Sequence, residues 1–411
     1  IKPSQCLILC ADKSSLTINS MNILSLWRQE VVKKHKIIGF SGSLIALAIA
    51  APSHAEITIL DKNPQSNSLL APLSLQVGGS IRPEWVFTNG PDANKSNKRG
   101  HDGGSRVRFR ADYKLTDHTS VIGYYEWGFN VPHFLGMKGN YEPGSLRDRQ
   151  RQLYAGFKDD RYGTLTYGHQ YGIYYSVVGI KSDVWDNDGH AGATGIGFNG
   201  DYDGANKPKN SIMYKNTFGP VTVSANYLLP EDQKDDGSGT GRSYRRNHGA
   251  GFGFDYAIMP TLSWAAAYSS TEANVKNSTT QKGYNQQVSG TALTWQPGNW
   301  YLTSTASYYK DFVPSTRNHT VSHYFAGSGY GLEEFVGYTF NIDKPFLKSI
   351  QPYVAVDSLR LKGDENYHAN HVYLGAGTEM GHGLSVYLER TIATTTDNEP
   401  DSTWITVFYN F

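Results

Sequence analysis

DSTWITVFYNF, residues 401–411, ends the sequence on an aromatic side chain. In an extended strand the alternate residues from Thr403 to Phe411 share one face, and those from Trp404 to Asn410 share the other. The last residues of a domain usually fray into water, so a β-branched and aromatic ending predicts a strand that is held in a sheet. A last strand that pairs with the first closes the sheet and leaves no free edge, as a sheet in hydrocarbon requires.

Period-two alternation runs through the sequence from Leu73 onward. In 106–113, for example, Val107 and Phe109 alternate with three arginines. About sixteen such segments follow one another, each near the ~10 residues with which a tilted strand spans a bilayer. Short connections at 115–119, 158–163, 216–220, 258–261 and 296–299 alternate with long polar ones at 89–104, 131–148, 173–206, 231–243 and 273–282. The pattern predicts an all-β fold, a 16-stranded antiparallel transmembrane β-barrel over residues 56–411.

The stretch KKHKIIGFSGSLIALAIAAPSHAE, residues 33–56, has the three parts of a secretory signal peptide. A basic region precedes an apolar core, and Ser53-His54-Ala55 forms a small-residue exit. We therefore expect a signal peptide over 32–55 with cleavage after Ala55. Residues 1–31 precede it and are expected to be upstream translation outside the working protein.

Composition excludes several classes of protein for the remaining chain. Both cysteines, Cys6 and Cys10, lie before the expected cleavage point, so no disulfide is expected. The first 55 residues hold six of the 38 Lys/Arg and two of the 37 Asp/Glu, which leaves the remainder three acidic residues in excess and argues against nucleic-acid binding. The glycine-rich strings at 249–254 and 327–331 lack the strand-to-helix context of a dinucleotide site. We expect neither a cofactor nor a structural metal, and a large soluble β-protein is the alternative fold.

Several longer motifs resemble one known family. TLTYGHQYGIYYSVVGIKSDVWDNDGH, residues 164–190, is similar to the fifth strand and third loop of the enterobacterial general diffusion porins, and the similarity is strongest over 104–227. The resemblance implies a homotrimer in the outer membrane, in contact with lipid and lipopolysaccharide, whose third loop folds inward to narrow each pore. It also implies that Phe411 and Tyr409 form the signal read by the outer-membrane assembly machinery. Gly79 stands where the family carries an inward lysine, and the third loop lacks the family's Pro-Glu-Phe-Gly-Gly run.

The basic wall of the pore follows from the same resemblance. Arg106, Arg151 and Lys215 match the family's basic residues, and Arg108 and Arg110 share the parity of Arg106. The alternative is that these side chains simply face solvent. Three arginines at every second position repel one another unless acids lie opposite, which favours the wall of a pore.

The acidic side is expected on the third loop and on the third strand. Asp183 matches the loop aspartate, Asp186 or Asp188 takes the place of its glutamate, and Glu126 matches an inward glutamate. For Asp201 and Asp203, an exposed loop position and a pore role stay equally open. With acids and bases facing each other, we expect a nearly balanced neck with a weak preference for cations.

Passive diffusion of ions and small hydrophilic solutes is the function that these features predict. The alternative is a sugar-preferring porin in which Tyr174, Tyr175 and Trp185, with Tyr167 and Tyr171 nearby, stack on sugar rings. An enzyme in the barrel is not expected, because Ser322 and His323 are sequence neighbours and would point to opposite faces of a strand. An adhesin or phage receptor with long outer loops stays open.

Overall fold

The computed structural model describes the chain from Glu56 to Phe411 with gaps. The described residues are 56–63, 68–88, 100–135, 149–187, 189, 191–192, 204–232, 234–235, 243–276, 281–312, 326–362 and 366–411. The expected signal peptide, together with Asp188, Asp201, Asp203, Ser322 and His323, lies outside the described residues.

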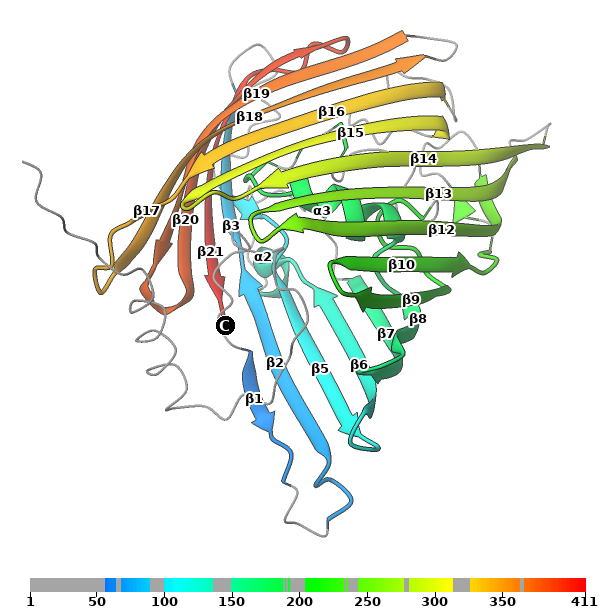
Figure 1. Ribbon diagram of the computed structural model, residues 1–411. Coiled ribbons are helices and arrows are strands. Elements are labelled where there is room, and N and C mark those ends of the chain that lie inside the picture. Colours follow the sequence, from blue (N-terminus) through cyan, green and yellow to red (C-terminus); the bar gives the residue numbers. More distant parts are fainter. Residues whose placement is uncertain are drawn as a thin grey trace, which may run out of the picture. The chain divides into compact units, whose positions relative to one another are not determined.

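Antiparallel strands make up most of the described chain (Figure 1). The strands of the first part are β1 (Ile57–Leu60), β2 (Leu73–Ile81), β3 (Pro83–Thr88), β4 (His101–Asp102), β5 (Arg106–Lys114), β6 (Thr119–Gly128), β7 (Arg149–Asp159), β8 (Gly163–His169), β9 (Ser211–Phe218), β10 (Val221–Leu228) and β11 (Lys234–Asp235). They are followed by β12 (Ser243–Met259), β13 (Leu262–Lys276), β14 (Gln281–Trp295), β15 (Trp300–Phe312), β16 (Ala326–Tyr338), β17 (Phe340–Asn341), β18 (Leu347–Lys362), β19 (Asn366–Met380), β20 (Leu384–Thr395) and β21 (Ser402–Asn410).

Helical structure in the described chain is short. It comprises α2 (Val131–Phe134), the π-helix η2 (Tyr175–Gly179), α3 (Ile180–Ser182) and the 3-10 turn η3 (Gly381–Gly383). None of the helices described is long and apolar enough to cross a membrane.

The long strands form a closed barrel of sixteen antiparallel spans over the described residues. β2 and β3 act as one span interrupted at Arg82, while β1, β4, β11 and β17 are short additions to the sheet. β21 pairs with β3 from Ser402 opposite Thr88 to Thr406 opposite Glu84, and then with the end of β2. This confirms the prediction that the last strand pairs with the first.

Phe411 completes the closure through its backbone. Its amide donates to the Gly79 carbonyl at 3.1 Å, and the Gly79 amide donates to the Phe411 carbonyl at 2.8 Å. Residues paired in this way share one face of the sheet. Gly79 therefore faces the same side as Phe411, and a Cβ at Gly79 would lie 2.7 Å from the Phe411 ring.

The two faces of the sheet differ as the alternation predicts. On β13, Trp264 and Tyr268 are exposed, whereas Ala265 and Ala267 between them are buried. We call the face with the exposed aromatic residues the outer face and the opposite one the inner face. Gly79 lies on the outer face, so the expectation that it replaces an inward lysine is wrong. The inner face of β2 carries Gln76, Gly78 and Ser80 instead.

Short and long connections alternate between the strands as predicted, except for one expected long connection. The turn after β5 spans 115–118, and the turn after β9 consists of residues 219–220. The long connection expected over 273–282 is wrong, because β13 continues to Lys276 and β14 begins at Gln281. Polar residues there continue the ladder, with Lys276 opposite Gln281, so polarity alone misplaced the ends of the strands.

β1 occupies the part of the β2 edge that β21 does not reach. Ile57 pairs with Val77 and Thr58 with Gln76. A Cβ placed on Gly78 would lie 2.8 Å from the Glu56 Cγ atom and 3.0 Å from the Phe411 carbonyl oxygen. β1 and β21 therefore follow each other along one edge of β2, with the Glu56 side chain on the inner face.

Candidate functional site

Four arginines form one patch on the inner face, which we call the arginine wall: Arg106, Arg108, Arg110 and Arg151. The first three alternate along β5 and lie opposite Ser80, Gly78 and Gln76 of β2. Their inward direction follows directly from period two. The structure thus brings together four of the five basic residues expected from the sequence.

Arg151 reaches the inner face by way of a β-bulge. Straight alternation along β7 would place it with Leu153 and Phe157, which are exposed on the outer face. On β6, Glu126 pairs with Gln152 and its neighbour Trp127 pairs with Gln150. Arg151 therefore has no partner of its own in the register and is the extra residue of the bulge. Bulges commonly re-aim a side chain in this way. The Arg151 Nε donates to the Glu126 Oε1 at 2.7 Å.

Lys215 lies apart from the arginine wall. It is on β9 near the turn 219–220, and it shares a rung with Thr164 of β8, which in turn pairs with Lys158 of β7. Lys158 is seven residues along β7 from Arg151. At ~3.3 Å per residue this separation is roughly 23 Å, well beyond the screening length in physiological salt.

Two carboxylates partly neutralise the arginine wall. Glu56 forms ion pairs with Arg108 and Arg110, whose Nε atoms lie 3.2 Å and 3.3 Å from its Oε1. Glu126 accepts Arg151 and also the Tyr124 hydroxyl, the latter at 3.0 Å. Sequence reasoning identified Glu126 but missed Glu56, because only the pairing of β1 with β2 brings Glu56 to this wall.

Arg106 lacks such a carboxylate partner. Its Nε donates to the Gly104 carbonyl at 3.0 Å. Among the described residues, no carboxylate lies within ion-pair distance of its guanidinium group. The remaining guanidinium nitrogens are therefore free to meet a solute.

The segment 171–192 between β8 and β9 packs against the inner face of the opposite wall; its residues 188 and 190 are outside the description. Ile173, Tyr174, Val177 and Val178 are buried in one apolar cluster. Their partners in that cluster come from β13, β14 and β15 and include Ala265, Ala267, Val288, Ala292 and Tyr309.

Two buried glutamates attach the far part of this segment to the wall. Glu333 of β16 accepts the backbone amides of Ala191 at 3.1 Å and Gly192 at 2.6 Å, together with the Ser182 hydroxyl. Glu389 of β20 accepts the Tyr353 hydroxyl at 2.7 Å and the backbone amides of residues 186 and 187. Carboxylates that accept several donors make strong, oriented attachments.

The aromatic residues expected to contact solutes lie in different places. Trp185 stacks on Phe335 with ring centroids 6.1 Å apart and is buried, and Tyr174 is buried and donates to the Gly192 carbonyl at 2.7 Å. Tyr167 is exposed on the outer face. Packing of segment 171–192 on the wall therefore uses Tyr174 and Trp185, and their expected exposure to solutes is wrong. Tyr175 is buried as well, so its expected exposure is also wrong.

Tyr171 and Tyr175 form a stacked pair with centroids 4.4 Å apart and an interplanar angle of 17°. The Tyr175 hydroxyl donates to the Asp183 carboxylate, and the Lys207 Nζ lies 4.8 Å from the centre of the Tyr171 ring. Burial raises the pKa of Tyr171, while the positive charges of Arg106 and Arg151 act in the opposite direction. The stacked pair thus lies within the field of the arginine wall.

Asp186 lies at the other end of the segment, against the last strands. It accepts the Thr406 hydroxyl at 2.7 Å. Burial raises the pKa of this carboxyl group to about 8; the Thr406 hydrogen bond opposes the rise, and the negative charges of Glu389 and Glu84 add to it. At neutral pH Asp186 is therefore mostly protonated and contributes little charge.

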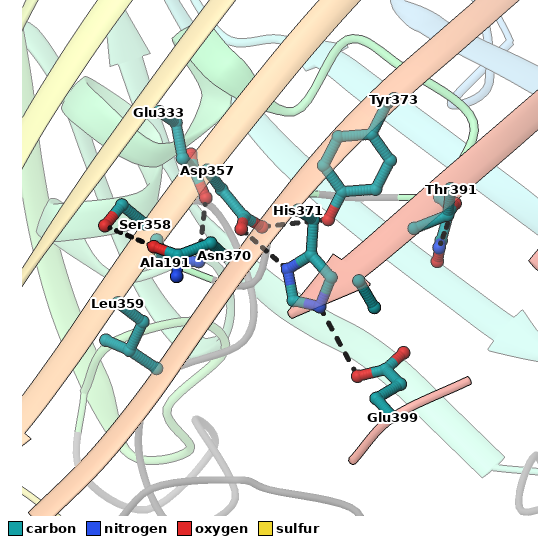
Figure 2. Close-up of polar contacts among 12 residues, drawn as sticks. Ala191, Glu333, Asp357, Ser358, Leu359, Asn370, His371, Tyr373, Thr391 and Glu399 are labelled. Carbon is teal, nitrogen blue, oxygen red and sulfur yellow. Dashed lines mark hydrogen bonds and ion pairs between the residues drawn. The ribbon is translucent and has the colours of Figure 1, made fainter. Parts of the chain in front are cut away.

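A further polar cluster lies in the wall near the loop 396–401. Figure 2 shows His371 of β19 between Asp357 of β18 and Glu399. The His371 Nδ1 lies 2.6 Å from Asp357 and its Nε2 lies 3.4 Å from Glu399, while the Tyr373 hydroxyl donates to Asp357 at 2.8 Å. The sequence did not reveal this cluster, because it depends on the register that puts Asp357 opposite His371.

Comparisons with known proteins indicate the family and the fold of the chain. Residues 42–411 match the family model described as Gram-negative porin. The putative outer membrane porin protein NmpC of Escherichia coli is 25% identical over 308 residues, which cover 70% of this chain and 76% of the relative. The outer membrane porin OmpD of Salmonella typhimurium is 22% identical over 390 residues, 90% of this chain and 94% of the relative. A structure of Salmonella typhi OmpF with daunomycin aligns with a TM-score of 0.62 at 15% identity and covers 83% of this chain and 98% of that one.

Proposed function

The chain belongs to the Gram-negative porin family and is a channel protein of the outer membrane, and from this premise we propose that solutes cross its lumen between the arginine wall and segment 171–192. Porins let ions and small hydrophilic solutes diffuse passively through water. What is proposed here is the location of the narrow part. One observation carries it: segment 171–192 contacts strands from β12 to β21, whereas the arginine wall lies on β5 and β7, outside those contacts.

Cysteine accessibility tests this location, because neither cysteine of the sequence lies after residue 10. We expect Arg106→Cys to react with a bulky methanethiosulfonate reagent and the single-channel conductance to drop. Val107→Cys is the matched control, since the neighbouring side chain points to the outer face and its modification should leave the conductance unchanged. Equal effects at both positions would show that the arginine wall does not line the narrow part.

The sugar-preferring alternative loses support from the geometry. All three aromatic residues expected to stack on sugars, Tyr174, Tyr175 and Trp185, are buried in the packing of segment 171–192. The relatives with similar sequences are named as porins, which are channels and not enzymes.

Three proposals carried over from the sequence concern assembly. We propose cleavage after Ala55, a homotrimer, and recognition of the terminal Tyr409 and Phe411 by the assembly machinery. Mass spectrometry of the outer-membrane protein tests the first, since the chain should begin at Glu56. Light scattering of the detergent-purified protein tests the second, with a protein mass three times that of one chain expected.

A further inference from the structure

The geometry points to a preference of this channel for small organic anions, and among these for carboxylates that carry a flat ring. This inference deepens the proposed function and rests on it. It concerns the solute class that the arginine wall and the stacked Tyr171 and Tyr175 would favour.

The first support is the balance of fixed charge. The arginine wall has four guanidinium groups, and the carboxylates paired with them are Glu56 and Glu126. Two positive charges therefore remain on this wall. Guanidinium groups keep their charge throughout the physiological range, so the excess is permanent.

The facing segment does not cancel this excess. Asp183 supplies one carboxylate, which is engaged by the Tyr175 hydroxyl. Asp186 is turned toward Thr406 of β21, and Lys181 is paired with Asp255 of β12. Glu333 and Glu389, which also contact the segment, are fully buried. Among the arginine wall and the two aspartates of the facing segment, positive charges therefore outnumber negative ones, which favours anions in place of the weak cation preference expected from the sequence.

The second support is the open guanidinium of Arg106. A planar guanidinium presents paired N–H donors that match the two oxygens of a carboxylate. Arg108, Arg110 and Arg151 each already form an ion pair with a glutamate, whereas Arg106 donates to the Gly104 carbonyl and senses Glu126 only from beyond ion-pair distance. A passing carboxylate can therefore take the place of a missing counter-ion at Arg106.

The third support is the stacked tyrosine pair near this arginine. Tyr171 keeps part of its surface exposed. Tyr175 stacks on its ring and the Lys207 Nζ lies 4.8 Å from the ring centre, so a flat solute ring stacks on Tyr171 by displacing the Lys207 side chain. A flat ring gains from such stacking beyond the burial of its area. A solute with a ring and a carboxylate can satisfy the tyrosine and the arginine together, whereas acetate or a neutral ring satisfies one of them.

Ion selectivity in planar bilayers tests the charge part. We expect the reversal potential in a KCl gradient to show higher permeability for Cl⁻ than for K⁺. Arg106→Ala should lower the Cl⁻/K⁺ permeability ratio by up to about 25-fold, because one charge ~4 Å from an ion in water favours Cl⁻ about fivefold and disfavours K⁺ by the same factor. Arg245→Ala, at an exposed position on the outer face of β12, is the control and should leave the ratio unchanged.

Solute competition tests the ring part. Benzoate should reduce the chloride current more than acetate or benzyl alcohol does, and Tyr171→Ala should abolish the difference between benzoate and acetate. Tyr167→Ala on the outer face should retain it. Wild-type protein that forms no channel would refute the proposed function itself. A channel that prefers K⁺, or one that treats benzoate and acetate alike, would overturn only this inference.

Discussion

Asp186 is the residue at which pH is expected to act on the channel. Its carboxyl group is half-buried where segment 171–192 meets the last strands. The polar and charged groups that face it from those strands are Arg82, Glu84, Tyr353, Tyr387, Glu389 and Thr406. A raised pKa means that the carboxyl group is neutral below about 8 and negative above it.

The first prediction follows from this sign. We expect the Cl⁻/K⁺ permeability ratio to fall as the pH rises through about 8, because ionised Asp186 adds a negative charge to the passage. Asp186→Asn should hold the ratio constant between about pH 6 and pH 9, since the amide does not titrate there. Reversal potentials measured across that range provide the check. A variant that keeps the full pH dependence would assign it to another group.

Glu56 supports a second prediction at the same scale. Glu56→Gln removes the negative charge that Arg108 and Arg110 share. The Cl⁻/K⁺ ratio should rise, while thermal stability should change little, because partly exposed ion pairs contribute about 0–1 kcal/mol. Reversal potentials and melting curves measured on the same preparation separate the two effects. An unchanged ratio would mean that permeating ions do not sense this charge.

Among the elements, segment 171–192 depends most on a few contacts. Its apolar part is held by side-chain packing. The backbone amides of residues 191 and 192 both donate to the carboxylate of Glu333, and their carbonyls accept from the Tyr309 and Tyr174 hydroxyls. Hydrogen bonds to charged groups contribute more than neutral ones, and donors left unpaired in a buried site carry an added cost.

The third prediction removes that carboxylate. Glu333→Ala should lower the free energy of unfolding by about 3 kcal/mol and increase the noise of the open-channel current, because the segment loses the carboxylate that accepts two of its backbone amides and the Ser182 hydroxyl. The neighbouring Glu334→Ala is a close control, since Glu334 is exposed on the outer face. Single-channel recordings and denaturant titrations measure both effects. Equal noise in the two variants would contradict the assigned role.

The sequence supports some of these elements better than others. Alternation alone gives the inner face of β5, because its three arginines keep strict period two. Arg151 needed the family resemblance, since a bulge reverses the parity that its strand would give. Register and loop packing decide the remaining features. These are the burial of Tyr174 and Trp185, the separation of Lys215 from the arginine wall, and the contact between His371 and Asp357. Those depend on pairings between residues far apart in the sequence, which local patterns do not contain.

For the whole molecule, closure of the barrel depends on the last residue. Phe411 contributes two backbone hydrogen bonds to Gly79, and its ring covers Gly79 on the outer face. An unpaired edge in a bilayer leaves backbone donors and acceptors without water or protein partners. The terminal residue is therefore part of the seam between β2 and β21.

The fourth prediction concerns this seam. Deletion of Phe411 should reduce the yield of heat-resistant, folded barrel in the outer membrane, whereas Phe411→Tyr should retain most of it because the backbone pair and the ring stay in place. Semi-native gel electrophoresis of unheated samples measures the yield. A deletion variant that folds as well as the wild type would show that the seam closes without this residue.

β1 and β21 follow each other along β2, so the barrel wall is nearly continuous where Glu56 lies next to Phe411. Glu56 and Phe411 both lie beside Gly78, so a short peptide linker can join them without moving either strand. The order of the strands along the chain can then be changed while their order around the barrel stays the same. A circularly permuted chain, joined from Phe411 to Glu56 and opened within the turn 296–299, should refold into the same barrel and conduct as the parent does.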